Sequence, residues 1–263
     1  MTNIVVQKFG GTSLADTERF KAVAKIIKDT SNEGKKVVVV VSAMAGETQR
    51  LIDLAKDVQK TPDPREYDAL ISSGEQVSVA LLAMTLRNEK VNSKSYTAFQ
   101  LGLKTDDYHG KARINSIDTK NILKDISADI TPVITGFQGV NEEGDITTLG
   151  RGGSDTSAVA LAVALEAEEC QIYTDVDGVY TTDPKVYEKA KKIDKLTFEE
   201  MLELSSLGAK VLQIRSVEFA SKYNMPIRVK SSFTNKEGTL INGEENMEDA
   251  LISGVTHTSD DAK

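Results

Sequence analysis

The chain has 263 residues, 40% of them hydrophobic and 27% charged, an ordinary globular composition with room for one large domain or two smaller ones. A formal net charge of −8 argues against nucleic acid as a main partner, and the single cysteine, Cys170, excludes an internal disulfide and fits a reducing compartment. The two histidines, His109 and His257, are too far apart in sequence to suggest a zinc site, and neither a signal peptide nor an apolar stretch of membrane-spanning length is apparent, so we expect a cytoplasmic protein without a membrane partner.

Predicted strands and helices alternate through the first part of the chain. A short apolar strand is expected at 3–7, and a helix at 16–28 has its apolar residues on one face. Residues 37–41 are five consecutive valines, which is typical of a strand buried on both faces. A helix beginning near Thr48 follows. This order predicts a parallel sheet with right-handed crossovers.

The middle of the chain is less regular. Helical periodicity resumes near Arg65 and is interrupted at Gly74, where a glycine costs about 1 kcal/mol against alanine and therefore needs a reason. The polar stretch 102–116 indicates an irregular excursion or a hairpin, and a turn signal at 141–144 predicts another hairpin. The other expected elements are strands at 95–99 and 130–135 and a helix around 122–126.

The most informative stretch is Gly150-Arg151-Gly152-Gly153, followed by Ser154 and Asp155. Three glycines in four residues permit backbone conformations closed to other residues and let a ligand approach the main chain. An apolar helix runs on from here, and the start of a helix presents unpaired N–H groups and a positive dipole end. Together with the guanidinium of Arg151, these features favour a site for a carboxylate or phosphate over a tight turn with a solvated arginine.

The rest of the chain continues the alternation. A strand at 170–174 leads into an acidic, glycine-containing loop, and Thr197 to Glu200 form a capping box ahead of a helix. The remaining expected elements are a helix from about 209 to 223, ending at Asn224, and late strands at 227–229 and 239–241.

Glycine-rich or hydroxyl-rich loops follow several of these strands, at 8–13, 42–48, 136–139, 150–157 and 174–183. Ligands of open parallel sheets bind beyond the carboxyl ends of the strands, so we expect these loops to form one cleft. The chain has no G-x-x-x-x-G-K-[ST] motif, which excludes a P-loop. A dinucleotide fingerprint starting at Gly150 is only partial, because its third position is Asp155.

A phosphoryl-transfer interpretation uses more of the chain. Lys8, followed by Gly10 and Gly11, offers a fixed positive charge beside exposed N–H groups, which suits a transferring phosphate. Glu75 follows a helix-breaking glycine, and it is either an ammonium-binding residue or a surface glutamate. The aspartates at 175, 177 and 183 lack the spacing of a calcium-binding loop and indicate a nucleotide loop or a plain acidic turn.

Six motifs of this sequence resemble those of aspartate kinase in order and spacing, over nearly the whole chain. The resemblance implies the amino-acid-kinase fold, a three-layer α/β/α sandwich around a mostly parallel sheet of about eight strands. The motifs are Lys8-Phe-Gly-Gly-Thr-Ser, Ser42-Ala-Met, Ser73-Gly-Glu75, Gly136-Phe-Gln-Gly139, Thr148-Leu-Gly-Arg-Gly-Gly-Ser-Asp155 and Tyr173-Thr-Asp-Val-Asp-Gly-Val-Tyr180.

The resemblance also implies roles for individual residues. Lys8 would neutralise charge on the transferring phosphoryl group, and Asp155 would organise Lys8 and the substrate. The aspartate site would be formed by Thr48, Glu75, Arg151, Gly152, Gly153 and Ser154. The ATP site would be formed by Lys8, Phe9, Gly10, Gly11, Ser42, Thr174, Asp175, Tyr180, Asp183 and Lys210.

The implied reaction transfers the γ-phosphoryl group of ATP, with Mg²⁺, to the side-chain carboxylate of L-aspartate, the first step toward lysine, threonine and methionine. That carboxylate is already ionised at neutral pH, so no general base is needed. Other interpretations are a kinase of another amino acid and a non-catalytic nucleotide-binding or sensor protein on the same fold. No side chain is assigned to the metal, and we expect a homodimer.

The resemblance also predicts how the chain is divided. Residues 1–246 would form the catalytic domain, and residues 247–263 would be a linker toward the regulatory ACT domains that usually follow in the family. By this resemblance, we expect no such domains within these 263 residues. We therefore expect neither lysine nor threonine to inhibit this chain, because the family's feedback control acts through them.

Overall fold

A computed structural model describes residues 3–184, 186–206 and 211–243. Within these residues the main sheet has eight strands, and the pairing of its neighbours β13 and β14 is the only antiparallel one. The predicted mostly parallel sheet is therefore confirmed. In spatial order the strands are β12 (Lys195–Thr197), β14 (Thr239–Asn242), β13 (Ile227–Ser231), β9 (Glu169–Thr174), β1 (Ile4–Phe9), β2 (Lys36–Val41), β6 (Thr131–Thr135) and β3 (Ser93–Tyr96).

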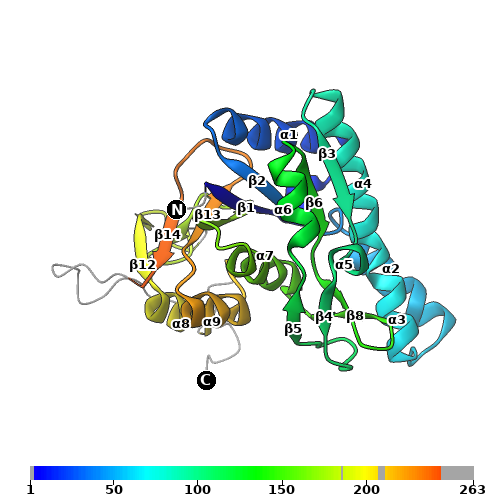
Figure 1. The fold of residues 1–263 in the computed structure, drawn as a ribbon. Coiled ribbons are helices and arrows are strands. Elements are labelled where there is room, and N and C mark those ends of the chain that lie inside the picture. Colours follow the sequence, from blue (N-terminus) through cyan, green and yellow to red (C-terminus); the bar gives the residue numbers. More distant parts are fainter. Residues whose placement is uncertain (1–2, 185, 207–210, 244–263) are drawn as a thin grey trace, which may run out of the picture.

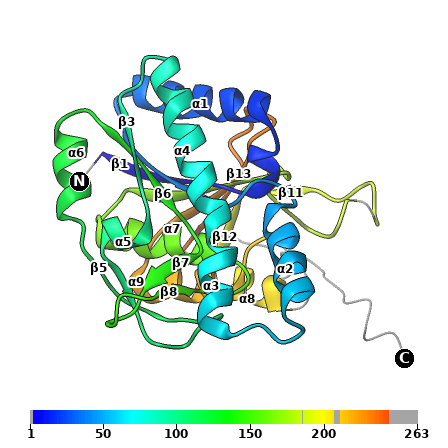
Figure 2. The ribbon, with the colours of Figure 1, turned by 90° about the vertical axis from the view of Figure 1, so that its right-hand side faces the viewer.

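Helices cover both faces of this sheet (Figures 1 and 2). On one side lie α1 (Thr17–Asn32) and α4 (Ser73–Asn88), and on the other lie α7 (Gly153–Ala164), α8 (Phe198–Ser206) and α9 (Ile214–Tyr223). The valines of β2 alternate between these layers, because successive side chains of a strand point to opposite faces. Val37, Val39 and Val41 join the core under α1 and α4, whereas Val38 and Val40 join the core that includes α7. This is the three-layer α/β/α arrangement expected from the sequence.

A second sheet projects beyond the main one and confirms both hairpin predictions. Its strands pair in the order β5-β4-β7-β8. The stretch 102–116 forms one antiparallel pair, and the turn at 141–144 closes the other. The strands are β4 (Leu103–Thr105), β5 (Ile114–Ile117), β7 (Gln138–Val140) and β8 (Ile146–Thr148). Since β8 ends just before Gly150, this sheet delivers the glycine-rich motif to the edge of the main sheet.

The structure gives a reason for Gly74. After α2 (Glu47–Val58), the helices α3 (Pro64–Ile71) and α4 follow each other through Ser72, whose backbone is still helical. A Cβ added at Gly74 would lie 2.8 Å from the Cβ of Ala43, in the loop after β2. A glycine is therefore needed where the start of α4 presses against that loop, and this contact places Glu75 beside it.

The expectation that no apolar stretch reaches membrane-spanning length is wrong. The continuous helical stretch Pro64–Asn88 has 25 residues and a window of mean hydropathy 1.4, so by length and composition it could span a membrane. Half of that window is buried inside the protein, because α4 packs on α1 and on the strands β3 and β6. That packing is the ordinary situation of a core helix, and length and composition alone do not assign a membrane.

Other differences concern element boundaries. The strand expected at 95–99 ends at Tyr96, because Thr97 and Gln100 form a capping box that starts the short helix α5 (Ala98–Leu101). The helix expected from 209 begins at Ile214 within the described part. It ends at Asn224 as predicted, and Asn224 has a left-handed conformation. The short strands β10 (Val179–Tyr180) and β11 (Lys192–Ile193) were not predicted. Helix α6 (Lys120–Ser127) and the Thr197–Glu200 capping box are confirmed.

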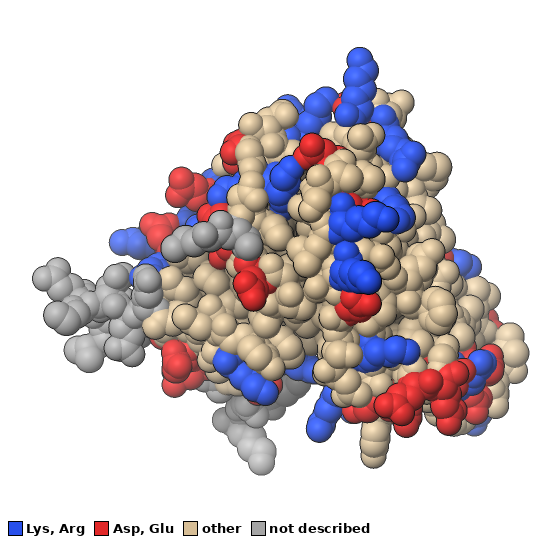
Figure 3. Space-filling model, in the orientation of Figure 1, with Lys and Arg blue, Asp and Glu red and all other residues tan. Residues whose placement is uncertain are grey.

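The charged surface is mixed. On the face drawn in Figure 3, Lys and Arg side chains lie among Asp and Glu, and acidic side chains gather at the lower right, near α3. Such a face, together with the net charge of −8, disfavours a polyanionic partner.

Candidate functional site

A cleft of about 270 Å³ lies where the end of β1 and the loops after β2, β6 and β8 meet the start of α4. It brings together the residues assigned from sequence to catalysis and to the acceptor, which come from distant parts of the chain. The lining residues are Lys8, Ser42, Thr48, Glu75, Phe137, Gly150, Arg151, Gly152, Gly153, Ser154, Asp155, Val211 and Gln213. The position of the cleft beyond the carboxyl ends of parallel strands is the one expected for a ligand site in such a sheet.

Lys8 and Asp155 form an ion pair inside this cleft. The Nζ atom of Lys8 lies 2.6 Å from Oδ1 of Asp155, and the two side chains are only 12% and 10% exposed. Oδ1 of Asp155 has no hydrogen-bond partner among the described residues, so the contact with Lys8 is an ion pair. Lys8 stands near the end of β1 and Asp155 in the first turn of α7, so two rigid elements set the position of the ammonium group.

Glu75 is a buried carboxylate with one unsatisfied oxygen. Its side chain is 3% exposed, and Oε1 accepts a hydrogen bond of 3.1 Å from the backbone N–H of Ala43. Oε2 is buried without a hydrogen-bond partner in the described part of the chain. Burial raises the pKa of Glu75 to about 7, and the N–H of Ala43 opposes that rise. Because Glu75 is buried, the alternative of a surface glutamate is wrong. A cationic ligand in the cleft would supply the missing partner of Oε2.

The turn around Arg151 also lines the cleft. Gly150 and Gly152 have φ values of +79° and +72°, a left-handed conformation that favours glycine. A Cβ on Gly152 would also lie 1.8 Å from Cγ of Gln213, so no larger residue fits there without displacing that side chain. Arg151 is exposed, Ser154 is buried, and Thr48 is half-buried on α2. An anion in the cleft would therefore meet a guanidinium, a hydroxyl and the start of α7.

The described residues assigned to ATP lie at or beyond the carboxyl ends of β1, β2 and β9, and only some of them line the cleft. The N–H of Gly10 donates to the carbonyl of Tyr173, and the N–H of Ser232 donates to that of Thr174, so three loops meet here. The residues Thr174, Asp175, Tyr180 and Asp183 do not line the cleft that holds Lys8. Lys210 lies outside the described residues.

The side chain of Phe9, which was assigned to the ATP site, does not reach the surface. It is fully buried in the core under α1 and α4 and stacks on Tyr173, with ring centroids 4.7 Å apart. Its alternation with Lys8 along β1 points the two side chains to opposite faces, so only the backbone of Phe9 is available to a nucleotide.

Sequence reasoning assigned no role to some residues of the cleft and its surroundings. Phe137 belongs to a motif that was noticed for its glycines, whereas Val211 and Gln213 gave no signal, because they precede α9 and reach the cleft through tertiary packing. In the acidic loop after β9, Asp177 pairs with Lys236 and accepts a hydrogen bond of 2.6 Å from Tyr180, and these contacts lower the pKa of Asp177. The pair with Lys236 ties the loop to the segment between β13 and β14.

No group of three or more metal-binding side chains occurs among the residues that the structure describes.

The protein thus combines a mostly parallel α/β/α fold with a cleft that holds a buried lysine–aspartate pair and a glycine-rich turn, in the position where such sheets bind ligands. Residues 3–231 match the model of the amino acid kinase family. The chain belongs to that family.

Individual relatives narrow the comparison. The aspartate kinase of Stutzerimonas stutzeri is 58% identical over 262 residues, which are 99% of this chain and 64% of that protein. Among solved structures, the aspartate kinase of Synechocystis has a TM-score of 0.81 and 46% identity, over 91% of this chain and 40% of that one. Aspartokinase III of E. coli, in complex with aspartate and ADP, has a TM-score of 0.84 and 30% identity, over 93% and 65% of the two chains. The chain spans less than two thirds of the length of these relatives.

Proposed function

We propose that this protein is an aspartate kinase, which transfers the γ-phosphoryl group of ATP to the side-chain carboxylate of L-aspartate and gives 4-phospho-L-aspartate. The observation that carries the proposal is one cleft lined by the Lys8–Asp155 pair, by Glu75 and by Arg151. The similarity to aspartate kinases, including one whose structure holds aspartate and ADP, supports it.

Each end of the acceptor has a matching group. The unsatisfied Oε2 of Glu75 would receive the ammonium group of an amino acid, and Arg151 with Ser154 would hold its α-carboxylate. A molecule held in this way directs its side chain toward Lys8. The buried lysine then stands between the acceptor carboxylate and the phosphate chain.

The chemistry requires two anions to meet. A side-chain carboxylate oxygen attacks the γ-phosphorus, a new O–P bond forms, and the bond from the γ-phosphorus to its bridging oxygen breaks as ADP leaves. The acceptor is already ionised, so the protein needs alignment and charge compensation rather than a base. Lys8 supplies a fixed positive charge, and Asp155 holds it in place. Mg²⁺ would neutralise part of the nucleotide charge, and we assign it no protein ligand.

Two other functions can be distinguished from an aspartate kinase by experiment. A kinase of another amino acid would use the same ammonium and carboxylate contacts but a different side-chain length. A pure nucleotide binder has no use for a buried lysine in the acceptor cleft, which is why we favour an enzyme. A homodimer and a cytoplasmic location remain predictions from the sequence.

The test is an ADP-release assay with ATP and Mg²⁺ across L-aspartate, L-glutamate and carbamate, with hydroxylamine present. We expect ADP release with aspartate alone and an equal amount of hydroxamate, because hydroxylamine captures acyl phosphates. ADP release with another acceptor would show a different kinase. Nucleotide binding in a thermal-shift assay without turnover of any acceptor would favour the sensor.

A further inference from the structure

The turn that carries Arg151 rests on another loop of the protein. The N–H of Ala112, after the tip of the β4–β5 hairpin, donates to the carbonyl of Thr148 at the end of β8 over 2.9 Å. A Cβ on Gly150 would lie 2.9 Å from the carbonyl oxygen of Gly110. The loop 109–112 and the segment 148–149 therefore form a common support, and whatever fixes them also fixes the start of the Arg151 turn.

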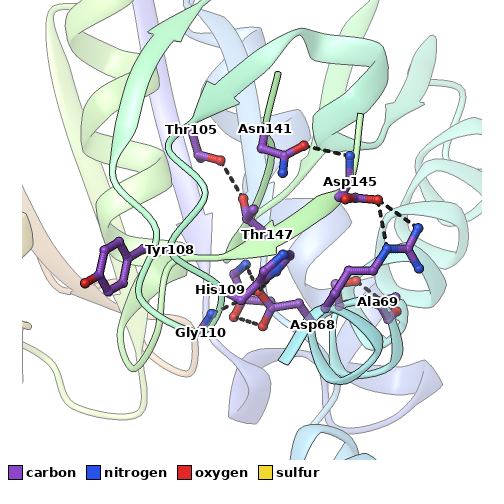
Figure 4. A network of polar contacts seen from close by, with 12 residues as sticks. Asp68, Ala69, Thr105, Tyr108, His109, Gly110, Asn141, Asp145 and Thr147 are labelled. Atoms are coloured by element: carbon purple, nitrogen blue, oxygen red, sulfur yellow. Dashed lines mark hydrogen bonds and ion pairs between the residues drawn. The ribbon is translucent and has the colours of Figure 1, made fainter. Parts of the chain in front are cut away.

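Asp68, on α3, holds this support from one side (Figure 4). It is fully buried, and its Oδ2 accepts the N–H groups of Gly110 and Thr148, each at 2.9 Å, and faces Nδ1 of His109 at 3.0 Å. Its Oδ1 accepts the hydroxyl of Thr148 at 2.6 Å. A buried carboxylate is costly unless its lone pairs are filled, and all four of these donors come from the two supporting segments. Asp68 thereby ties one segment to the other.

Arg215, on α9, holds the same two segments from the other side. Its Nη1 donates to the carbonyl of Leu149 over 2.9 Å, and its Nη2 donates to that of Ala112 over 2.7 Å. The guanidinium is partly buried, and this burial lowers its pKa from the usual value. Its charged N–H groups donate to backbone carbonyls rather than to a carboxylate. Gln213, the N-cap of the same helix, packs against Gly152.

We propose that Asp68 and Arg215 are positioning residues that hold the Gly150–Arg151 turn from α3 and from α9, so that Arg151 meets the acceptor's carboxylate. Neither residue lines the cleft, so each acts through the backbone rather than by touching a ligand. A small misplacement of a binding group costs up to about 100-fold in such reactions, which makes a double clamp on one turn functionally meaningful. The identity of the acceptor rests on the proposed function, whereas the placement of the turn does not.

The test uses Asp68→Asn and Arg215→Met in the 263-residue chain, with Arg215→Lys as the conservative variant. The control is Arg65→Ala, which removes an ion pair of 2.7 Å between α3 and Asp145 just before β8, away from the Arg151 turn. Backbone hydrogen exchange reports the turn directly and needs no substrate. We expect roughly 10-fold faster exchange across 109–112 and 148–154 in the Asn and Met variants, an intermediate change in Arg215→Lys and no change there in the control.

Kinetics supply the second measurement. We expect the KM for aspartate to rise roughly 10-fold in the Asn and Met variants while the KM for ATP stays within about twofold, because the nucleotide loops are elsewhere. Exchange across 148–154 that is unchanged, or raised equally by Arg65→Ala, would overturn the positioning role whatever the activity. If the unaltered protein phosphorylates no acceptor, the proposed function fails, and the exchange result alone decides for or against the two clamps.

Discussion

Lys8 is the residue on which the proposed chemistry depends most. Its ammonium group matters most as charge moves from the γ-phosphate to the leaving ADP, so its removal should affect the transition state more than substrate binding. We predict that Lys8→Ala lowers kcat by roughly 100- to 1,000-fold and changes the KM for aspartate little. Steady-state kinetics check this, with Lys36→Ala as the control, since Lys36 pairs with Asp129 on the exposed surface. A Lys8→Ala enzyme with a normal kcat and a raised KM would contradict the assignment.

Glu75 should make acceptor binding depend on pH. Because its pKa is about 7 in the free protein, the carboxylate is largely protonated at pH 6 and largely ionised at pH 8. An ammonium group binds only the ionised form well. We predict that the KM for aspartate falls as the pH rises from 6 to 8, with a midpoint near 7, and that Glu75→Gln abolishes this dependence and raises the KM throughout. A pH profile of the KM that is the same in both proteins would sink the ammonium role.

The same residue should lower the stability of the unliganded protein at high pH. Its pKa is about 7 when folded and 4.5 as a free side chain, so the folded state binds more protons between these values. Stability is therefore full below pH 4.5, is lost as the pH rises to about 7, and stays low above it, by about 3 kcal/mol. We predict that urea denaturation at pH 8 shows Glu75→Gln to be more stable than the unaltered protein, with a smaller difference at pH 5. An equal difference at both pH values would contradict the buried, unpaired carboxylate.

At the scale of elements, the start of α4 gives a test of packing against helix propensity. Alanine in place of a helical glycine gains about 1 kcal/mol by propensity, whereas overpacking costs about 1–3 kcal/mol. A Cβ at Gly74 would lie 2.8 Å from Ala43 and 3.4 Å from Glu47, so we expect packing to dominate. We predict that Gly74→Ala destabilises the protein by about 1 kcal/mol in urea denaturation and weakens aspartate binding, since Glu75 follows. The exposed Ala80 of the same helix offers the control Ala80→Gly. A stabilised Gly74→Ala protein would show that the helix relaxes away from the loop.

Elements of this fold were predictable where their signal was local. A few neighbouring residues are enough to indicate three of these elements. The local patterns are the five valines of β2, the Asp16 N-cap of α1 and the Thr197 capping box. The strand expected at 95–99 was partly wrong because a capping box at Thr97 outweighed the β-propensity of Phe99. The short strands β10 and β11 exist only through their pairing with each other, which no local pattern shows.

The candidate site shows the same division. The Lys8, Glu75 and Arg151 motifs carry their chemistry in sequence, and the structure places all three in one cleft. The contacts of Gln213, Arg215 and Asp68 join segments that are 42 to 103 residues apart, and nothing near these residues in sequence indicates them. Phe9 shares a strand with Lys8 but faces the core, a distinction that the motif alone does not make.

At the scale of the whole molecule, the proposed function fixes how the acceptor lies in the cleft. Glu75 and Arg151 would hold the ammonium group and the α-carboxylate, so the side-chain carboxylate would be the one presented to Lys8. This orientation makes the reaction specific for one of the two carboxylates of aspartate.

Reduction of the product shows which carboxylate of aspartate was phosphorylated. The protein is incubated with ATP, Mg²⁺ and L-aspartate, the acyl phosphate is reduced with borohydride, and the resulting amino alcohols are separated. A phosphorylated side-chain carboxylate gives homoserine, which is the predicted product. Recovery of 3-amino-4-hydroxybutanoate would mean that the α-carboxylate is phosphorylated and that aspartate lies in the cleft the other way round. Recovery of neither alcohol while ADP forms would mean that aspartate is not the acceptor.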